Sequence, residues 1–478
     1  QYDASDRWLR LALGLGWKID APAREIAELT VSFADVAWQT ADPAEAEEAL
    51  TRAIDIWRPA MGDHDDDRLL MARLRDLRGN TLFGQADVEG AREELSDAIA
   101  ELEPGPPSRA RALLLNRLGW TYWRAGPAAD AIPIIERAIT ESEASDADDV
   151  LRWAKHELGV TLAMLGRENE GVVLLEESLE LARASGDREL LLRCCINLPA
   201  TREARGDRLG PLEEMSFEGL QLARRLAGGQ YIIWLASNRA EHLLELGRIV
   251  EAEEHQSEAI THAETISFVL LGSHYCWRAL VRLLLDDREG AAQDIASGER
   301  VGIPSDPQVA AAHPLSVALY RWDEDPQAAT EGLLAWASEH VDGKSSTYLL
   351  AVELARMALR LDDRTALDRA ARLTELHTDF RPITPQLARG AWVQGLVDGD
   401  SGAVADAAAE LERFGLKLQA SEAWADAALL AARAGIESEA ATHAAKLVDE
   451  MDIRPWLGPL PETRWLEPAK DESEASTV

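Results

Sequence analysis

Apolar residues recur at helical spacing along almost the whole chain, and a small residue interrupts the pattern about every 40 positions. The clearest unit predicts a first helix over about 109–124, a break at Gly126–Pro127, and a second helix that carries Ala131, Ile135 and Ala138. Apolar positions three and four residues apart share one face of a helix, so each unit predicts a helix–turn–helix hairpin.

The interrupting residues mark the corner of each predicted hairpin. They are Gly126, Gly166, Gly206, Gly247, Asp287, Asp325, Asp363, Asp400 and Gly435, with weaker candidates near Asp42 and Ala86. A fixed period of this length is typical of solenoids, in which each unit buries its apolar face only against its neighbours. Glycine after the first helix would provide a left-handed cap. The sequence therefore predicts an all-α fold, a right-handed α-solenoid of about eleven helical hairpins.

Four regions follow from this pattern. We expect N-terminal hairpins over 1–108, the best-formed repeats over 109–300, more degenerate repeats over 301–466, and a disordered acidic tail over 467–478. Proline-rich connections near the first two boundaries end helices and are interpreted as kinks between stacked hairpins.

Charge and cysteine content narrow the function classes. The chain has 85 acidic and 49 basic residues, a net charge of −36, so it repels phosphate backbones and we expect no direct nucleic-acid binding. The acidic excess is interpreted as solvated helix surface, with a docking surface for a basic partner as the alternative. Three cysteines, two of them adjacent, favour a reduced cytoplasmic protein with buried thiols, and we expect no membrane association.

A family resemblance rests on the best-formed unit. Leu118–Gly119, Tyr122, Gly126, Ala131 and Ala138 match the tetratricopeptide repeat (TPR) pattern at its own internal spacings, although the units run near 40 residues instead of 34. The chain therefore resembles a TPR array with several degenerate units.

Longer segments resemble a particular kind of TPR region. They are "LEESLELARASGDRELLLRCCINL", "RAEHLLELGRIVEAEEHQSEAI" and "ELERFGLKLQASEAWADAALLAARAG". These are similar to the C-terminal repeats of actinobacterial-type multidomain regulators, either STAND ATPase/LuxR-type transcriptional regulators or related cyclases. The resemblance implies a non-catalytic sensing region whose ligand relieves autoinhibition of an ATP-dependent module. Because the chain starts at Gln1 inside a helical pattern, we expect it to be the C-terminal part of something longer. A freestanding cytosolic adaptor that binds a partner protein is the alternative.

Candidate binding residues lie 13, 10, 6 and 3 positions before the corners, or one residue beside that stripe. In TPR arrays this stripe lines the concave groove. The candidates are Asn116, Trp120, Trp123, Trp153, His156, Asn197, Trp234, Asn238, His274 and Trp277. Tryptophan, asparagine and histidine suit a groove that binds a peptide, a partner protein or a small-molecule effector. Any single tryptophan is better interpreted as filling the core between hairpins, whereas the stripe as a whole favours a groove.

Other motifs point to no chemistry. Glu251, His255, Glu258 and His262 share a helix face, but the two histidines are two turns apart, about 10 Å, and surface charge is the better interpretation. No nucleophile elbow, HExxH, CxxC or phosphate-binding loop is present. We therefore expect no catalytic residues, no metal site and no cofactor. An oligomer is compatible with the sequence.

Overall fold

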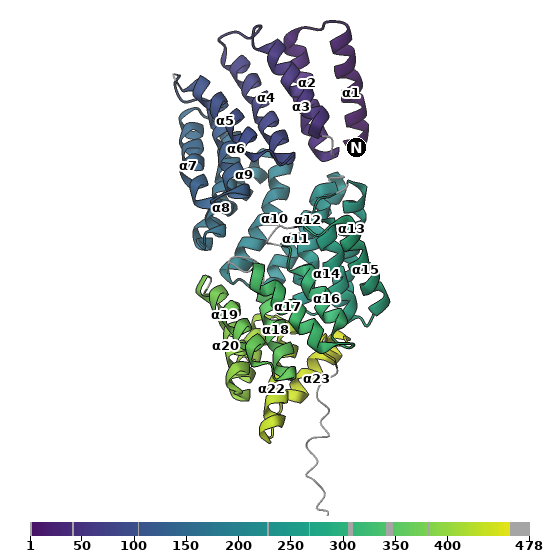
Figure 1. The fold of residues 1–478 in the computed structure, drawn as a ribbon. Helices are drawn as coiled ribbons and strands as arrows, with labels where there is room; N and C mark the ends of the chain where they lie inside the picture. The colour runs from purple at the N-terminus through teal and green to yellow at the C-terminus, as the bar shows by residue number, and fades with distance from the viewer. Residues whose placement is uncertain are drawn as a thin grey trace, which may run out of the picture. The chain divides into compact units, whose positions relative to one another are not determined.

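A computed structural model describes residues 2–40, 43–103, 105–226, 229–266, 268–304, 309–340, 348–380 and 382–458. Within these residues the fold is all-α (Figure 1). The helices are α1 (Tyr2–Lys18), α2 (Ala23–Thr40), α3 (Pro43–Trp57), α4 (Asp65–Gly84), α5 (Val88–Leu102), α6 (Arg109–Ala125), α7 (Ala128–Ala144), α8 (Asp148–Met164), α9 (Glu168–Ser185), α10 (Arg188–Arg205), α11 (Leu209–Leu226), α12 (Gly229–Glu245), α13 (Ile249–Thr265), α14 (Leu271–Leu284), α15 (Arg288–Val301), α16 (Ala312–Arg321), α17 (Pro326–His340), α18 (Tyr348–Leu361), α19 (Arg364–Phe380), α20 (Thr384–Asp398), α21 (Ser401–Phe414), α22 (Lys417–Ala434) and α23 (Ala440–Met451). None of the described helices is long and apolar enough to cross a membrane.

The helices pair in chain order as the sequence pattern predicts. After α1, the pairs from α2–α3 to α22–α23 make eleven hairpins in the described residues, with an even-numbered first helix and an odd-numbered second helix in each. This confirms the predicted all-α solenoid of about eleven hairpins. The acidic tail expected at 467–478 and the weak corner at Asp42 lie outside the described residues.

The corners use two kinds of backbone chemistry. Gly166 and Gly247 have φ of 78°, the left-handed region that favours glycine. At Asp287 the preceding Asp286 takes the left-handed turn, with φ of 58°, and the Asp287 carboxylate caps the next helix by accepting a 2.9 Å hydrogen bond from Gly290 N. Gly126 corrects one expectation, because its φ of −171° is extended backbone and the break there falls before Pro127.

Glycines inside the helices allow the two helices of a hairpin to approach closely. A Cβ on Gly159 of α8 would lie 2.9 Å from the carbonyl oxygen of Gly171 on α9, and a Cβ on Gly171 would lie 2.6 Å from that of Gly159. Gly119 of α6 is similar, since a Cβ there would lie 2.4 Å from Cγ1 of Ile135 on α7. These contacts explain why small residues recur in the repeat pattern.

The chain divides into two compact units. Unit 1 comprises Gln1–Arg205, Met215–Leu235 and Thr265–Ser267, and unit 2 comprises Gly206–Glu214, Ala236–Glu264 and Phe268–Val478. In unit 1, apolar side chains of successive hairpins form a chain of small cores, for example Leu114, Leu118, Ala131 and Ile135 between α6 and α7.

Unit 2 has one large continuous core and returns on itself. After α23 the chain runs back to α14, where Arg454 N donates to Leu284 O at 2.8 Å and Trp456 Nε1 donates to Leu280 O at 3.0 Å. Gly247, at the corner after α12, leaves room for Met451 of α23, because a Cβ there would lie 2.7 Å from the Met451 sulfur. The last hairpin of unit 2 therefore packs beside its first ones.

A buried ionic cluster joins three first helices of unit 2. Arg356 of α18 is 1% exposed and its guanidinium lies 2.7 Å from both Glu353 and Glu422 and 3.2 Å from Asp426. Trp392 of α20 donates to Asp426 of α22 at 3.1 Å. The cluster fixes α18, α20 and α22 to one another at the centre of the core.

Candidate functional site

The ten candidate residues from the sequence fall in both units. Seven lie in unit 1, namely Asn116, Trp120, Trp123, Trp153, His156, Asn197 and Trp234, and three lie in unit 2, namely Asn238, His274 and Trp277. All ten are on first helices, α6, α8, α10, α12 and α14.

A chain of hydrogen bonds connects three consecutive first helices in unit 1. Trp123 Nε1 of α6 donates to Glu157 Oε2 of α8 at 2.9 Å. His156 Nδ1 lies 3.3 Å from Glu157 Oε1, and His156 Nε2 lies 3.0 Å from Asn197 Nδ2 of α10. Trp123 and His156 thus meet through one carboxylate that the prediction did not include, and Asn197 joins them through His156.

These contacts stabilise the ionised form of the Glu157 carboxyl. His156 is fully buried and Glu157 is 3% exposed. Burial alone would raise the pKa of Glu157, but the hydrogen bond from His156, the nearby Arg193 charge and the Trp123 indole hold it below its ordinary value. The carboxylate therefore stays ionised in a place where few ions are tolerated.

Two tryptophans of the stripe, Trp120 and Trp153, differ in burial and in the contacts they make. Trp120 is 7% exposed and its ring centroid lies 4.5 Å from that of Phe83 on α4, so it contributes mainly to packing between hairpins. Trp153 is half-buried, and its Nε1 donates to Asp187 Oδ2 at 3.2 Å. Trp153 leaves part of its ring available for a ligand, whereas Trp120 does not.

Two ionic side chains on α4 and α6 were missed by the sequence prediction. Arg117 of α6 makes a two-point contact with Asp76 of α4, at 2.8 Å and 3.3 Å, and lies 3.3 Å from Asn80. Asp76 and Asn80 stand 10 and 6 positions before Ala86, which has φ of 66° and is the corner of that hairpin. Applying the rule of 13, 10, 6 and 3 positions to this weaker corner would have found Asp76 and Asn80, although not Arg117.

A second contact extends the same surface to α12. Tyr231 donates to Glu189 Oε1 of α10 at 2.9 Å, and Arg193 of α10 hydrogen-bonds the Tyr231 hydroxyl. We call these joined side chains the first-helix face of unit 1; it comprises Asp76, Arg117, Trp123, His156, Glu157, Glu189, Arg193, Asn197 and Tyr231.

Asp35 of α2 is also influenced by charges of this face. Burial raises its pKa to about 6, with Arg73 opposing this and the charges of Asp76 and Glu189 adding to it.

The unit 2 candidates sit in a more enclosed setting. His274 of α14 is 5% exposed, with Nδ1 3.1 Å from Gln256 Nε2 and 3.3 Å from Ser237 Oγ. Burial lowers its pKa to about 4, so the imidazole is neutral at pH 7. Trp277 and Asn238 are half-buried, and Trp277 packs partly against the core of unit 2.

The remaining sequence motifs are engaged in contacts of their own. Glu251 pairs with Arg248, and His255 lies 2.6 Å from Arg239 and 3.3 Å from Glu258. Among the described residues no group of three or more metal-ligating side chains could hold an ion. The thiols of Cys194, Cys195 and Cys276 are buried as expected, and burial raises their pKa to about 12, 11 and 12.

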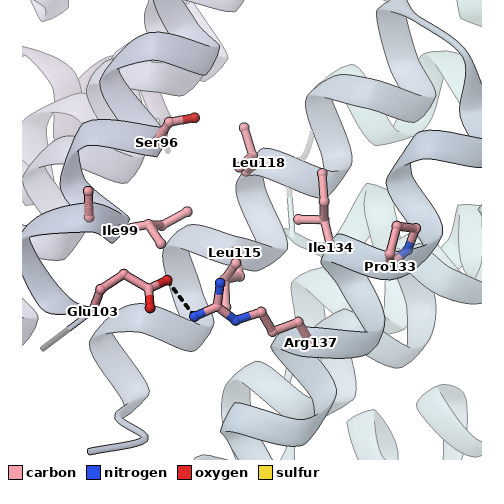
Figure 2. A pocket seen from close by; sticks show the side chains of 9 residues that line it. Ser96, Ile99, Glu103, Leu115, Leu118, Pro133, Ile134 and Arg137 are labelled. Atoms are coloured by element: carbon pink, nitrogen blue, oxygen red, sulfur yellow. Dashed lines mark hydrogen bonds and ion pairs between the residues drawn. The ribbon is translucent and has the colours of Figure 1, made fainter. Parts of the chain in front are cut away.

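An apolar hollow of about 330 Å³ lies outside the predicted stripe, between the second helices α5 and α7 (Figure 2). Leu115 and Leu118 of α6 form its floor, and the ion pair between Glu103 and Arg137, 2.6 Å long, crosses its mouth. Pro133, inside the continuous helix α7, is part of its wall. No sequence pattern predicts this hollow, because its walls come from three helices whose separation is not encoded by local spacing.

Comparison with known proteins supports the fold. No protein-family model matches the sequence, and no curated protein matches it. Among solved structures, a Rap protein complexed with Competence and Sporulation Factor is 13% identical with a TM-score of 0.52, covering 75% of this chain and 99% of that chain. The apo quorum sensor NprR from B. thuringiensis is 13% identical with a TM-score of 0.52, covering 74% and 100%. A STAND protein with a tetratricopeptide repeat sensor from Pyrococcus horikoshii is 12% identical with a TM-score of 0.47, covering 75% of this chain and 53% of that chain. The chain thus has a TPR-like helical-repeat fold of the kind seen in the Rap protein and NprR.

Proposed function

We propose that this chain is a non-catalytic sensing scaffold that binds a short peptide, or an extended segment of a partner protein, on the first-helix face of unit 1. The contact that carries the proposal is the chain Trp123–Glu157–His156–Asn197. It places an indole, an ionised carboxylate, an imidazole and an amide side by side on three consecutive first helices, α6, α8 and α10.

A peptide is the ligand class that suits this surface. Its backbone offers a hydrogen-bond donor and an acceptor at every residue, which suits a face that carries both donor and acceptor side chains from α6 to α12. The likeness of fold to a Rap protein that was solved with Competence and Sporulation Factor supports this choice. The half-buried ring of Trp153 adds an apolar surface on which a side chain can lie.

We further propose that the bound state is transmitted to a signalling module of a multidomain regulator of the STAND or LuxR type. The sequence resemblance supports this finer assignment. A full-length gene that encodes no such module would contradict it and would favour the adaptor role.

The binding proposal is tested by affinity selection from a pooled library of random hexapeptides, with enriched sequences resynthesised and titrated by fluorescence polarisation. We expect Trp153→Ala to weaken binding about tenfold or more while far-UV circular dichroism stays unchanged. Trp8→Ala is the matched control, because Trp8 is 71% exposed on α1, away from the face. Failure to enrich any peptide, or equal binding by Trp153→Ala, would overturn the proposal.

A further inference from the structure

Arg193 is the cation of the first-helix face whose hydrogen-bonding capacity is left largely unused. It lies half-buried on α10, with its guanidinium 6.0 Å from the centroid of the Trp153 ring. Its hydrogen-bond partner among the described residues is the hydroxyl of Tyr231, and its buried Nε has none. No carboxylate of a described residue forms an ion pair with it.

Other buried or half-buried arginines of unit 1 are paired with a carboxylate. Arg117 makes two contacts with Asp76, at 2.8 Å and 3.3 Å. Arg111 makes two contacts with Glu141, at 3.0 Å and 2.8 Å. A guanidinium withdrawn from water without such a partner is costly, since its N–H donors lose hydration and gain nothing in return. Arg193 therefore has capacity for a carboxylate partner that the described residues of this chain do not provide.

The two nearest acidic groups are already committed. Glu157 accepts from Trp123 and contacts His156, and Glu189 accepts from Tyr231. Burial opposes the charge of Arg193, whereas the Tyr231 oxygen and these two carboxylates favour it, so its pKa stays above the ordinary value. They balance its charge through space, but apart from the bond to the Tyr231 hydroxyl they accept no hydrogen bond from it, and its buried Nε–H has no acceptor among the described residues.

We propose that Arg193 binds a carboxylate of the peptide ligand, either its C-terminus or the side chain of an Asp or Glu, with Trp153 flanking the contact. This assignment rests on the proposed peptide-binding function of the same face. A guanidinium presents parallel N–H donors in a planar fork, and a carboxylate is the peptide group that accepts two of them at once. Because Glu157 and Glu189 offset the positive charge, selectivity comes from hydrogen-bond geometry more than from net attraction.

The experiment compares two hexapeptide pools of identical random composition, one with free C-terminal carboxylates and one amidated, by affinity selection on the whole chain. Enriched peptides are then titrated with and without Asp→Asn and Glu→Gln changes, which separates a terminal carboxylate from an acidic side chain. Each is measured against the natural chain, Arg193→Met, Arg193→Lys and the control Arg183→Met, which alters an exposed arginine of α9.

We expect removal of the recognised carboxylate to weaken binding about ten- to one-hundred-fold in the natural chain and in Arg183→Met. In Arg193→Met the same removal should have no effect, and Arg193→Lys should fall between, because lysine keeps the charge without the fork. Arg193→Lys also serves as the readout if Arg193→Met loses helicity. Peptides that bind equally with or without the carboxylate, or whose carboxylate preference survives in both Arg193 variants, would overturn this assignment alone. A natural chain that binds no peptide from either pool would overturn the proposed function with it.

Discussion

The imidazole of His156 and the amide of Asn197 are 41 positions apart in the sequence, yet Nε2 of one lies 3.0 Å from Nδ2 of the other. The other ring nitrogen, Nδ1, faces Glu157 Oε1 at 3.3 Å. The imidazole therefore bridges an amide on α10 and a carboxylate on its own helix, α8.

The pH response of Glu157 follows from this arrangement. Its pKa is held below the ordinary value, so the stabilisation it provides is complete above the unfolded-state pKa and is lost as pH falls through the folded-state pKa. We expect Glu157→Leu to lower the free energy of unfolding at pH 7 by about 1–3 kcal/mol, because Trp123 and His156 lose their acceptor. Denaturant titrations at pH 7 and pH 4 measure this, and the difference between the natural chain and Glu157→Leu should shrink at pH 4. Glu180→Leu, at an exposed position of α9, is the control, and a difference unchanged with pH would contradict the argument.

The glycines that allow close helix packing give a second prediction. At Gly159 an added Cβ would meet the Gly171 carbonyl oxygen at 2.9 Å, so Gly159→Ala should lower the free energy of unfolding by about 1–3 kcal/mol. Gly14 of α1 is the matched control, because an added Cβ there meets nothing within 4 Å. Gly14→Ala should instead stabilise by about 0.5–1 kcal/mol, since alanine loses less backbone entropy in a helix. Denaturant titration combined with hydrogen exchange in α8 and α1 distinguishes the two; equal effects would contradict the packing argument.

The fold was predictable because its determinants are local. A small residue at each corner and apolar positions three and four apart define a hairpin without reference to the rest of the chain, and Asp287 and Gly166 lie where the helices turn. The exception is instructive. Gly126 was expected to be left-handed, but Pro127 after it makes an extended break sufficient.

The site was predictable only in part. The stripe rule placed Trp123, His156 and Asn197 on one surface. His156 and Asn197 do contact each other, but Trp123 reaches them only through Glu157, which lies one residue beside the stripe. Which side chains pair between repeats depends on small rotations of one helix relative to the next, and sequence spacing does not record them. For the same reason the burial of Trp120 and the exposure of Trp153 could not be separated in advance.

His274 gives a prediction on the effect of mild acid. Burial lowers its pKa to about 4, so between pH 6.5 and pH 4 the unfolded chain binds a proton that the folded chain does not, and stability falls as pH falls. Lowering pH from 7 to 5 should therefore cost about 2 kcal/mol through this residue. His274→Gln keeps a hydrogen-bonding side chain but cannot titrate, so it should lose that part of the pH dependence, as measured by denaturant midpoints. His64→Gln, an exposed position, should retain it. Identical pH profiles for the natural chain and His274→Gln would refute the assignment.

The ionic cluster around Arg356 should respond very differently to the loss of its cation and of one acid. Three buried carboxyl groups face Arg356, with Arg360 as a second cation 2.9 Å from Asp426, and burial raises the pKa of both Glu353 and Glu422. A raised carboxyl pKa means that the folded state retains a proton, so this part of the stability is present at low pH and is lost as pH rises above the unfolded-state pKa. Glu422→Gln mimics the protonated acid and should change the free energy of unfolding by less than about 1 kcal/mol at pH 7, with a weaker decline towards alkaline pH. Arg356→Met leaves the carboxyl groups without their main partner and should cost about 3–5 kcal/mol. Denaturant titrations of both variants from pH 5 to pH 9 decide the matter, and a Glu422→Gln cost as large as that of Arg356→Met would show that Glu422 is ionised in the core.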